Sequence, residues 1–118
     1  MTRFTLFSTA LLVGLLVACN GEEEEPITIG EGTTPEYAWD GGPASQITVL
    51  RGDLEDADYA WAVLHPDGDE IDSPVVHGVV PTGATELYSD ELELTEGVTY
   101  SVWVQWSDDT RETVSFTP

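Results

Sequence analysis

Apart from carboxylates, few side chains in this sequence could do covalent or acid–base chemistry. The 118-residue chain holds one cysteine and two histidines beside 23 aspartates and glutamates. His65 and His77 do not form a pair with the spacing of metal ligands, and Cys19 lies far from both. No serine occupies a Gly-x-Ser-x-Gly sequence, the turn that presents the nucleophile in many hydrolases. We therefore expect a protein that is not an enzyme and that needs no catalytic cofactor.

The acidic run Asp67–Asp72 has the oxygen-rich composition of a calcium loop. An EF-hand loop starting at Asp67 would place Ile71 at position 5, where an oxygen ligand is required. Pro66 fixes its own φ, and an Asp-Gly pair suits the backbone of a tight turn. The run therefore predicts a hairpin turn in preference to a calcium site.

The net charge excludes two classes of partner. The formal charge is −20, and the chain has three cationic residues, all of them arginine. Nucleic-acid binding requires lysines and arginines to neutralise phosphates, and attraction to anionic lipid headgroups requires a basic patch. Such a charge also destabilises a compact state by self-repulsion, which salt screens. We expect no nucleic-acid partner, and we regard a saline habitat as a hypothesis.

The N-terminus is typical of a secretory signal peptide. Arg3 precedes an uncharged, largely apolar run to Ala18 that is shorter than the roughly 20 residues needed to span a bilayer. Leu16-Val17-Ala18-Cys19 resembles the lipobox of bacterial lipoproteins. The resemblance implies cleavage before Cys19, a diacylglycerol on its sulfur and anchoring in a membrane. Asn20, where aspartate often marks inner-membrane retention, implies the outer membrane.

The residues after the cysteine predict an extended linker. Four consecutive glutamates, Glu22–Glu25, repel one another, and Gly, Thr and Pro are frequent up to Pro35. Sixteen residues reach at most on the order of 50 Å. The sequence thus divides into residues 1–18 (signal peptide), 19–35 (lipidated Cys19 and linker, with Ile27–Ile29 as an optional edge strand) and 36–118 (folded domain). The acidic run resembles a surface-export signal of some bacterial lipoproteins, but a solvated spacer is the alternative, so display on the periplasmic face or on the cell surface stays open.

Period-two alternation dominates the rest of the chain and predicts short β-strands. The clearest case is 98–106, where Tyr100, Val102 and Val104 share one face and Trp103 lies on the other. Similar runs are 45–50, 58–64, 75–80, 85–94 and 113–117, separated by turn residues rich in Gly, Pro and Asp. The expected fold is all-β: a single antiparallel β-sandwich of about seven strands.

One stretch carries a family resemblance. Leu94-Thr95-Glu96-Gly97-Val98-Thr99-Tyr100 resembles the corner before strand F in immunoglobulin-like and fibronectin type III domains. The resemblance implies that Leu94 packs in the core and that the Tyr100 hydroxyl bonds to backbone upstream. It also implies Trp61 as the core aromatic of strand C. Glu96 departs from the usual proline of this corner.

The same resemblance would place two acidic loops at one end of the sandwich. These loops contain the calcium candidates Asp53, Glu55, Asp56, Asp58, Asp108 and Asp109. A divalent cation would relieve their mutual repulsion, and solvated, salt-screened charge is the alternative.

Trp103 is the candidate binding residue because it faces away from the Tyr100 side of its strand. An exposed tryptophan can stack on a sugar or anchor a protein partner, whereas packing beside neighbouring strands is the structural alternative. The sequence favours a membrane-anchored lipoprotein that displays a binding module for an envelope or extracellular protein or glycan. The alternatives are a structural accessory subunit of an envelope complex and a calcium-dependent adhesion module.

Overall fold

The computed structural model describes residues 26–52 and 58–118, and within them the protein is entirely β. The strands are β2 (Ile27–Ile29), β3 (Glu36–Trp39), β4 (Gln46–Arg51), β5 (Asp58–Leu64), β6 (Val75–Val76), β7 (Thr85–Tyr88), β8 (Tyr100–Gln105) and β9 (Arg111–Phe116). Within these residues no helix has the length and apolar character needed to cross a membrane. The expected signal peptide, Cys19 and the four consecutive glutamates lie outside the described residues.

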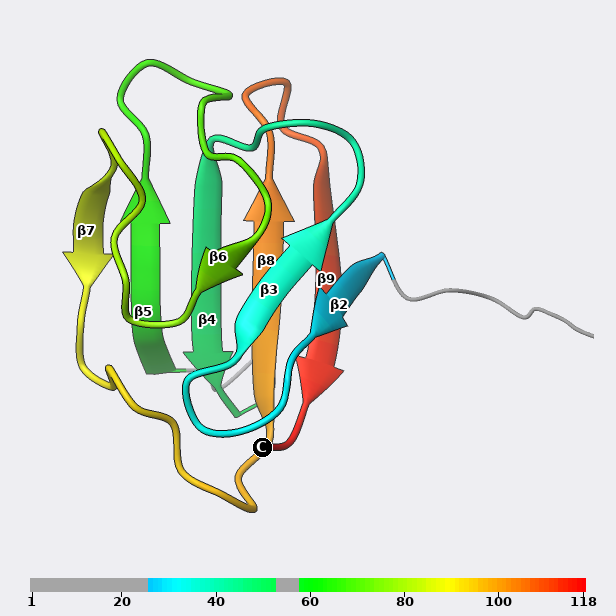
Figure 1. The fold of residues 1–118 in the computed structure, drawn as a ribbon, viewed down its shortest axis with the longest axis vertical. Coiled ribbons are helices and arrows are strands. Elements are labelled where there is room, and N and C mark those ends of the chain that lie inside the picture. The colour runs from blue at the N-terminus through cyan, green and yellow to red at the C-terminus, as the bar shows by residue number, and fades with distance from the viewer. Residues whose placement is uncertain (1–25, 53–57) are drawn as a thin grey trace, which may run out of the picture.

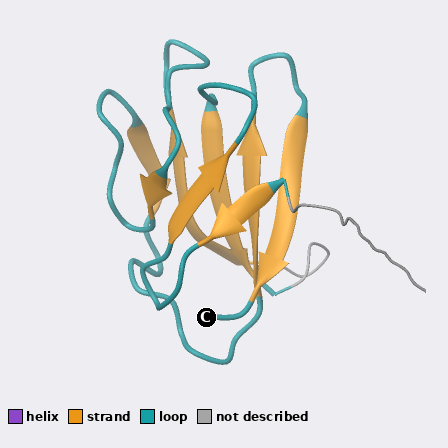
Figure 2. Ribbon diagram, turned by 45° about the vertical axis from the view of Figure 1, so that its right-hand side comes forward, coloured by secondary structure: helices purple, strands orange, loops and turns teal. Residues whose placement is uncertain are grey.

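Two antiparallel sheets form the layers of a β-sandwich (Figures 1 and 2). The three-stranded sheet has the order β2-β3-β6, and the five-stranded sheet has the order β7-β5-β4-β8-β9. In Figure 1 the small sheet lies in front of the large one. The expected all-β sandwich is therefore observed.

Alternation along the central strands separates a core face from an outer face. On β8, Tyr100, Val102 and Val104 are fully buried between the sheets. On β4, Ile47 and Val49 lie in register with this row and are equally buried. Opposite them, the small sheet contributes the core side chains Ile27, Tyr37, Trp39 and Val75. Burial of this apolar surface from both sheets is the main force that holds the two layers together.

The sandwich begins before the boundary expected at residue 36. Ile27–Ile29 pairs with β3 in the register Ile27↔Trp39 to Ile29↔Tyr37, and Ile27 is 1% exposed. The optional edge strand is thus a real strand of the domain. A buried β-branched residue with a paired backbone explains why this segment joins the sheet although glycine, threonine and proline follow it.

The strand order corrects the expected position of Trp61. Its side chain is fully buried, as expected of a core aromatic. In immunoglobulin-like domains strand C lies beside strand F, the strand of the corner tyrosine. Here β4 lies between β5 and β8, so the strand of Trp61 is not the neighbour of the strand of Tyr100. Trp39 lies on β3, the central strand of the small sheet.

The Asp67-Gly68 turn forms, but it does not close a hairpin. The Gly68 N–H donates to the His65 carbonyl at 3.2 Å, and Gly68 has a φ of +98°. The strands on either side, β5 and β6, belong to different sheets. The turn therefore begins a connection between the two layers.

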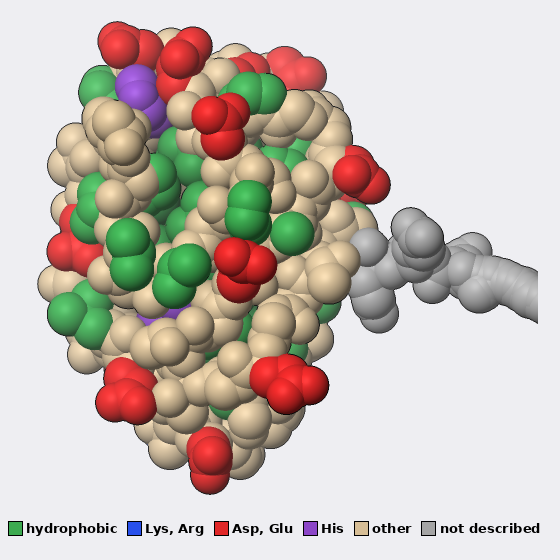
Figure 3. Space-filling view, viewed as in Figure 1, with side chains coloured by type: hydrophobic (Ala, Val, Ile, Leu, Met, Phe, Trp, Pro, Cys, Tyr) green, Lys and Arg blue, Asp and Glu red, His purple; other side chains and the backbone are tan. Residues whose placement is uncertain are grey.

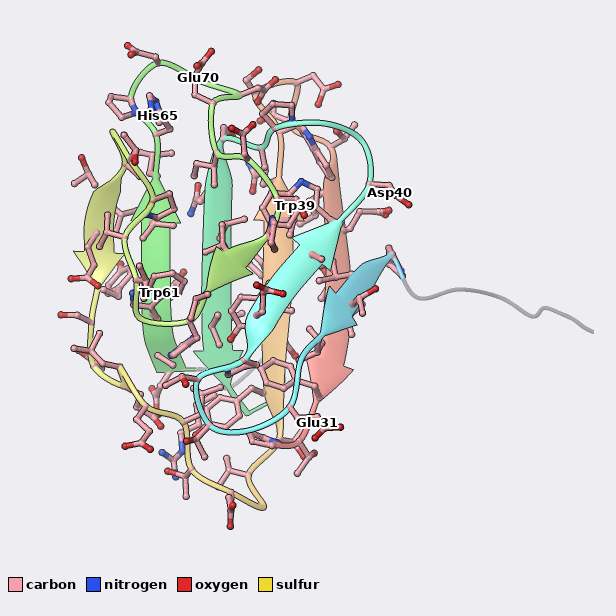
Figure 4. All side chains as sticks on the ribbon, viewed as in Figure 1. Glu31, Trp39, Asp40, Trp61, His65 and Glu70 are labelled. Atoms are coloured by element: carbon pink, nitrogen blue, oxygen red, sulfur yellow. The ribbon has the colours of Figure 1, made fainter. Side chains whose placement is uncertain are left out.

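Acidic side chains lie at both ends of the sandwich and also at its sides and near the middle of the face drawn in Figure 3. No Lys or Arg side chain is seen on the face drawn there, among the described residues. Figure 4 shows His65 and Glu70 at the upper end and Glu31 at the lower end.

Candidate functional site

The outer face of the five-stranded sheet carries no carboxylate among the residues that the structure describes. The strand registers place the following side chains on it: Gln46, Thr48, Leu50, Tyr59, Ala62, Leu64, Thr85, Tyr88, Ser101, Trp103, Gln105, Arg111, Thr113 and Ser115. Leu50 and Ala62 are buried yet lie outside the core cluster, which agrees with an outward orientation. The chain has 23 acidic residues, so a surface whose one charged side chain among the described residues is Arg111 needs a functional explanation. We call it the outer face.

Trp103 lies on the outer face at β8, next to the edge strand β9, and one arginine lies over its ring. The guanidinium carbon of Arg111 lies 4.3 Å from the centre of the indole ring, which is a cation–π contact. Thr48, in register with Trp103 on β4, is only 1% exposed. Trp103 is itself partly exposed, so packing beside neighbouring strands accounts for much but not all of its surface. Its indole Nε1 is buried and has no acceptor within the described part of the chain.

Two tyrosines form the second aromatic group of the outer face, at its β7 edge. The rings of Tyr59 and Tyr88 are stacked, with centroids 4.3 Å apart and an interplanar angle of 5°. Each residue is 42% exposed. Beside them is an open depression of about 580 Å³, lined by Arg51, Asp58, Tyr59, Tyr88, Asp90 and Glu91. We call it the tyrosine groove.

The structure does not bring the described calcium candidates together. Asp58 begins β5 and lies in register with Arg51, which pairs in turn with Tyr100 at the start of β8. Asp108 and Asp109 lie in the turn after the end of β8, so they are at the opposite end of the sheet. The prediction that Asp58 shares one end with Asp108 and Asp109 is therefore wrong. The strand β4 is antiparallel to both β5 and β8, so β5 and β8 run in the same direction and the start of β5 lies far from the end of β8. Asp53, Glu55 and Asp56 lie outside the described residues.

Within the described ranges, no three metal-ligating side chains converge. In the β8–β9 turn, the Thr110 backbone N–H and hydroxyl both donate to Asp108 Oδ1, and these hydrogen bonds lower the pKa of Asp108. Asp109 has a φ of +72°, a conformation that aspartate tolerates better than most residues. Asp69 accepts from the Ser107 N–H and hydroxyl at 2.8 and 2.9 Å. Asp108 and Asp69 therefore stabilise the β8–β9 turn by hydrogen bonds.

A polar network that the sequence analysis missed centres on Glu91. One carboxylate oxygen accepts from the Tyr100 hydroxyl at 2.8 Å, and the other pairs with Arg51 at 2.9 Å. The Thr95 N–H donates to the same Tyr100 hydroxyl at 2.8 Å, which confirms the expected bond to backbone upstream. Leu94 is buried in the core, also as expected. The network holds the segment between β7 and β8 against the end of the large sheet.

His77 extends this network into the core. Its Nε2 lies 2.7 Å from the Glu91 carbonyl, and its Nδ1 lies 2.9 Å from the Tyr37 hydroxyl. A carbonyl can only accept, so Nε2 carries the proton and Nδ1 accepts from Tyr37 in the neutral ring. Burial lowers the pKa of His77, partly opposed by the Glu91 carbonyl and charge. Burial also raises the pKa of Tyr37, so the two side chains form a neutral hydrogen-bonded pair.

Comparisons with protein-family models, curated proteins and solved structures found no match for this chain.

Proposed function

We propose that the protein is a non-enzymatic lipoprotein of a bacterial cell envelope that binds a partner through the outer face of its β-sandwich. The observation that carries the binding role is the absence of carboxylates from this face, within the described residues, although the chain is strongly acidic. Interface centres are depleted in charged residues and enriched in tyrosine, tryptophan and arginine. The outer face contains residues of these types, namely Tyr59, Tyr88, Trp103 and Arg111.

The N-terminal sequence supports the anchoring part of the proposal. The lipobox-like Leu16-Val17-Ala18-Cys19 follows an apolar run, and Cys19 is the one cysteine of the chain. Lipidation with two or more acyl chains anchors a protein stably without a basic patch. The residues between Cys19 and the start of β2 at Ile27 then connect the anchor to the domain, and the acidic charge of Glu22–Glu25 would repel anionic headgroups.

An immunoglobulin-like assignment of the sandwich belongs to the same proposal. The Tyr100 hydroxyl bonds to backbone five residues upstream, as in a tyrosine corner. The neighbours β4, β8 and β9 have the order of strands C, F and G, and β5 and β7 extend this sheet as strands C′ and C″ do in variable-type domains. Folds of this kind serve many functions, so the binding role depends on the surface and not on the fold.

Anchoring is tested with cells that express the full chain or its Cys19→Ala variant. Labelling with a radioactive or clickable fatty acid should mark the unaltered chain, which should fractionate with the outer membrane. The Cys19→Ala variant should carry no label and should leave the membrane fraction. Equal labelling of both chains would refute anchoring at Cys19.

Binding through the outer face is tested by site-specific photocrosslinking in intact cells. A photoreactive residue at Thr113 or Ser115, both exposed on the outer face, should give a discrete adduct. The same residue at Thr28, exposed on the small sheet, is the matched control. A second substitution, Thr113→Glu, should weaken the adduct from Ser115 by placing a negative charge on the exposed part of the face. Adducts of equal yield from Thr28 and Ser115 would contradict a face-specific partner.

A further inference from the structure

The tyrosine groove combines exposed aromatic rings with an excess of negative charge. Tyr59 and Tyr88 come from neighbouring strands, and their parallel rings shield only one face of each other. Two tyrosines that are each 42% exposed keep substantial apolar surface in water. A groove of about 580 Å³ is within the size range of ligand sites.

The charges of the groove do not cancel. Arg51 is its one cationic residue, and its guanidinium is held by Glu91 at 2.9 Å. Asp58 and Asp90 bring the number of lining carboxylates to three. Neither aspartate side chain accepts a hydrogen bond from any described residue, although the charge of Asp58 acts on Arg51. The groove therefore presents uncompensated negative charge directly beside two π faces.

These two properties together select a cationic ligand. An anion would be repelled, and a purely aliphatic group would leave the carboxylates without a partner. A guanidinium group stacks on a tyrosine face and donates to a carboxylate at the same time, which an ammonium group does less well. The outer face already contains one such contact, since Arg111 lies over Trp103 at 4.3 Å.

The chain cannot supply this cation itself. It has three cationic residues, of which Arg51 and Arg111 have the partners just described and Arg3 lies in the segment expected to be cleaved. A second copy has the same arginines and carries the same charge of −20, so self-association is opposed by repulsion. The complementary occupant is a different, basic protein.

We propose that the tyrosine groove binds an arginine side chain from a basic segment of a partner protein. The inference rests on the proposed binding function and names the chemistry of its partner. The guanidinium stacks on a tyrosine ring and donates to Asp58 or Asp90. The negative field of the domain raises the rate of encounter and makes binding sensitive to salt.

The test measures binding of a fluorescent, end-capped Gly-Arg-Gly-Arg-Gly peptide to the full chain in a nonionic detergent. A peptide with citrulline in place of arginine has nearly the same shape without the charge. We expect binding of the arginine peptide that weakens between 20 and 300 mM NaCl, and at least about tenfold weaker binding of the citrulline peptide. Equal affinity for the two peptides would overturn the proposal, as would shifts of the tyrosine NMR signals with a neutral glucan oligosaccharide but not with the arginine peptide.

Matched variants separate the groove from the general charge of the domain. Tyr88→Leu keeps an apolar side chain but removes the π face, and it should weaken binding about 3- to 30-fold. Tyr88→Phe should retain the affinity of the unaltered chain. Asp90→Asn should weaken binding more than Glu70→Gln, which makes the same charge change at the other end of the sandwich (Figure 4). Thermal unfolding of each variant verifies that it is folded.

Equal losses in Asp90→Asn and Glu70→Gln would show that only long-range charge is at work and would overturn the groove assignment. The photocrosslinking from Thr113 and Ser115 is independent of this result. Persisting adducts with no arginine-dependent binding would remove the proposed ligand while the proposed function stands. Loss of the adducts together with intact arginine binding would remove the proposed partner of the outer face, while the arginine site in the tyrosine groove stands.

Discussion

The buried His77 should make the stability of the domain depend on pH between neutrality and mild acid. Its ring is 1% exposed and packs at 5.0 Å, centroid to centroid, against Trp61. Desolvation favours the neutral ring and lowers its pKa in the folded state below the ordinary value of 6.5. The unfolded chain therefore binds a proton near pH 6.5 that the folded chain does not.

The sign and the size of the effect follow from proton linkage. Stability contributed by neutral His77 is fully present above pH 6.5 and is lost as the pH falls from 6.5 toward the lowered folded-state pKa. The loss is at most about 1.4 kcal/mol per pH unit. A domain of this size is stable by about 5–15 kcal/mol, so the effect is measurable. The groups that face His77 are the Tyr37 hydroxyl and the Glu91 carbonyl, and the Glu91 carboxylate is engaged by Arg51 and Tyr100.

The assay is urea unfolding of the full chain in detergent, followed by tryptophan fluorescence at pH 7.5, 6.5 and 5.5. The His77→Gln variant should lose about 1–3 kcal/mol at pH 7.5, because Tyr37 or the Glu91 carbonyl loses its partner. Relative to the unaltered chain, this deficit should shrink toward pH 5.5. His65→Gln, at a partly exposed histidine, is the control for loss of an imidazole. Parallel pH profiles of the unaltered chain and His77→Gln would refute the reasoning.

Further predictions concern single contacts and the overall charge. Tyr100→Phe removes the hydroxyl shared by Thr95 and Glu91 and should cost about 1–3 kcal/mol in urea unfolding; an unchanged midpoint would show that water replaces it. Gly78→Ala should destabilise the domain more than Gly97→Ala does. Both glycines have positive φ, but only at Gly78 would a Cβ approach a backbone oxygen, at 2.9 Å; equal losses would mean that this contact relaxes freely. Trp103→Ser should leave the domain folded by circular dichroism, with a loss below the roughly 3–5 kcal/mol of a buried tryptophan. Raising NaCl from 20 mM to 1 M should increase the melting temperature, since screening weakens self-repulsion, and a constant melting temperature would argue against this.

The strands with strong alternation were predictable because their signal is local. In 98–106, five apolar or aromatic residues at period two define a face without knowledge of any partner, and β8 is found there. The hydroxyl bond of Tyr100 was predictable for a related reason, since its backbone partner lies five residues away. By contrast, only Val75–Val76 of the run 75–80 is a strand, because Gly78 turns the chain toward Leu92.

The strand order was not predictable, because it depends on pairing between distant segments. Placing β4 beside β8 moves β5 outward, and it puts the β4–β5 connection and the β8–β9 turn at opposite ends. Because β4 and not β5 pairs with β8, two predictions were wrong: the strand position of Trp61, and the shared location of Asp58 with Asp108 and Asp109. The pattern of each strand alone is compatible with either order.

The polar network escaped sequence analysis for a similar reason. His77 bonds to Tyr37, 40 residues away, and to the carbonyl of Glu91, 14 residues away. In the sequence, Glu91 looks like one more acidic residue in an acidic segment. Only its partial burial and the two bonds of its carboxylate distinguish it from a solvated surface charge.

The distribution of charge argues for a partner more strongly than its total does. If acidity served solubility alone, carboxylates would be expected on the outer face as well as at the ends, because strand edges and exposed sheet positions gain from charge. The small sheet follows this expectation with an exposed Glu36 on β3. The outer face of the larger sheet instead has tyrosine, tryptophan, serine, threonine and one arginine where carboxylates would be harmless to the core. The carboxylates Asp58 and Asp90 lie at the tyrosine groove. A surface that must meet a specific cation needs its negative charge beside the aromatic rings, and it needs the rest of the face free of carboxylates that would be costly to desolvate.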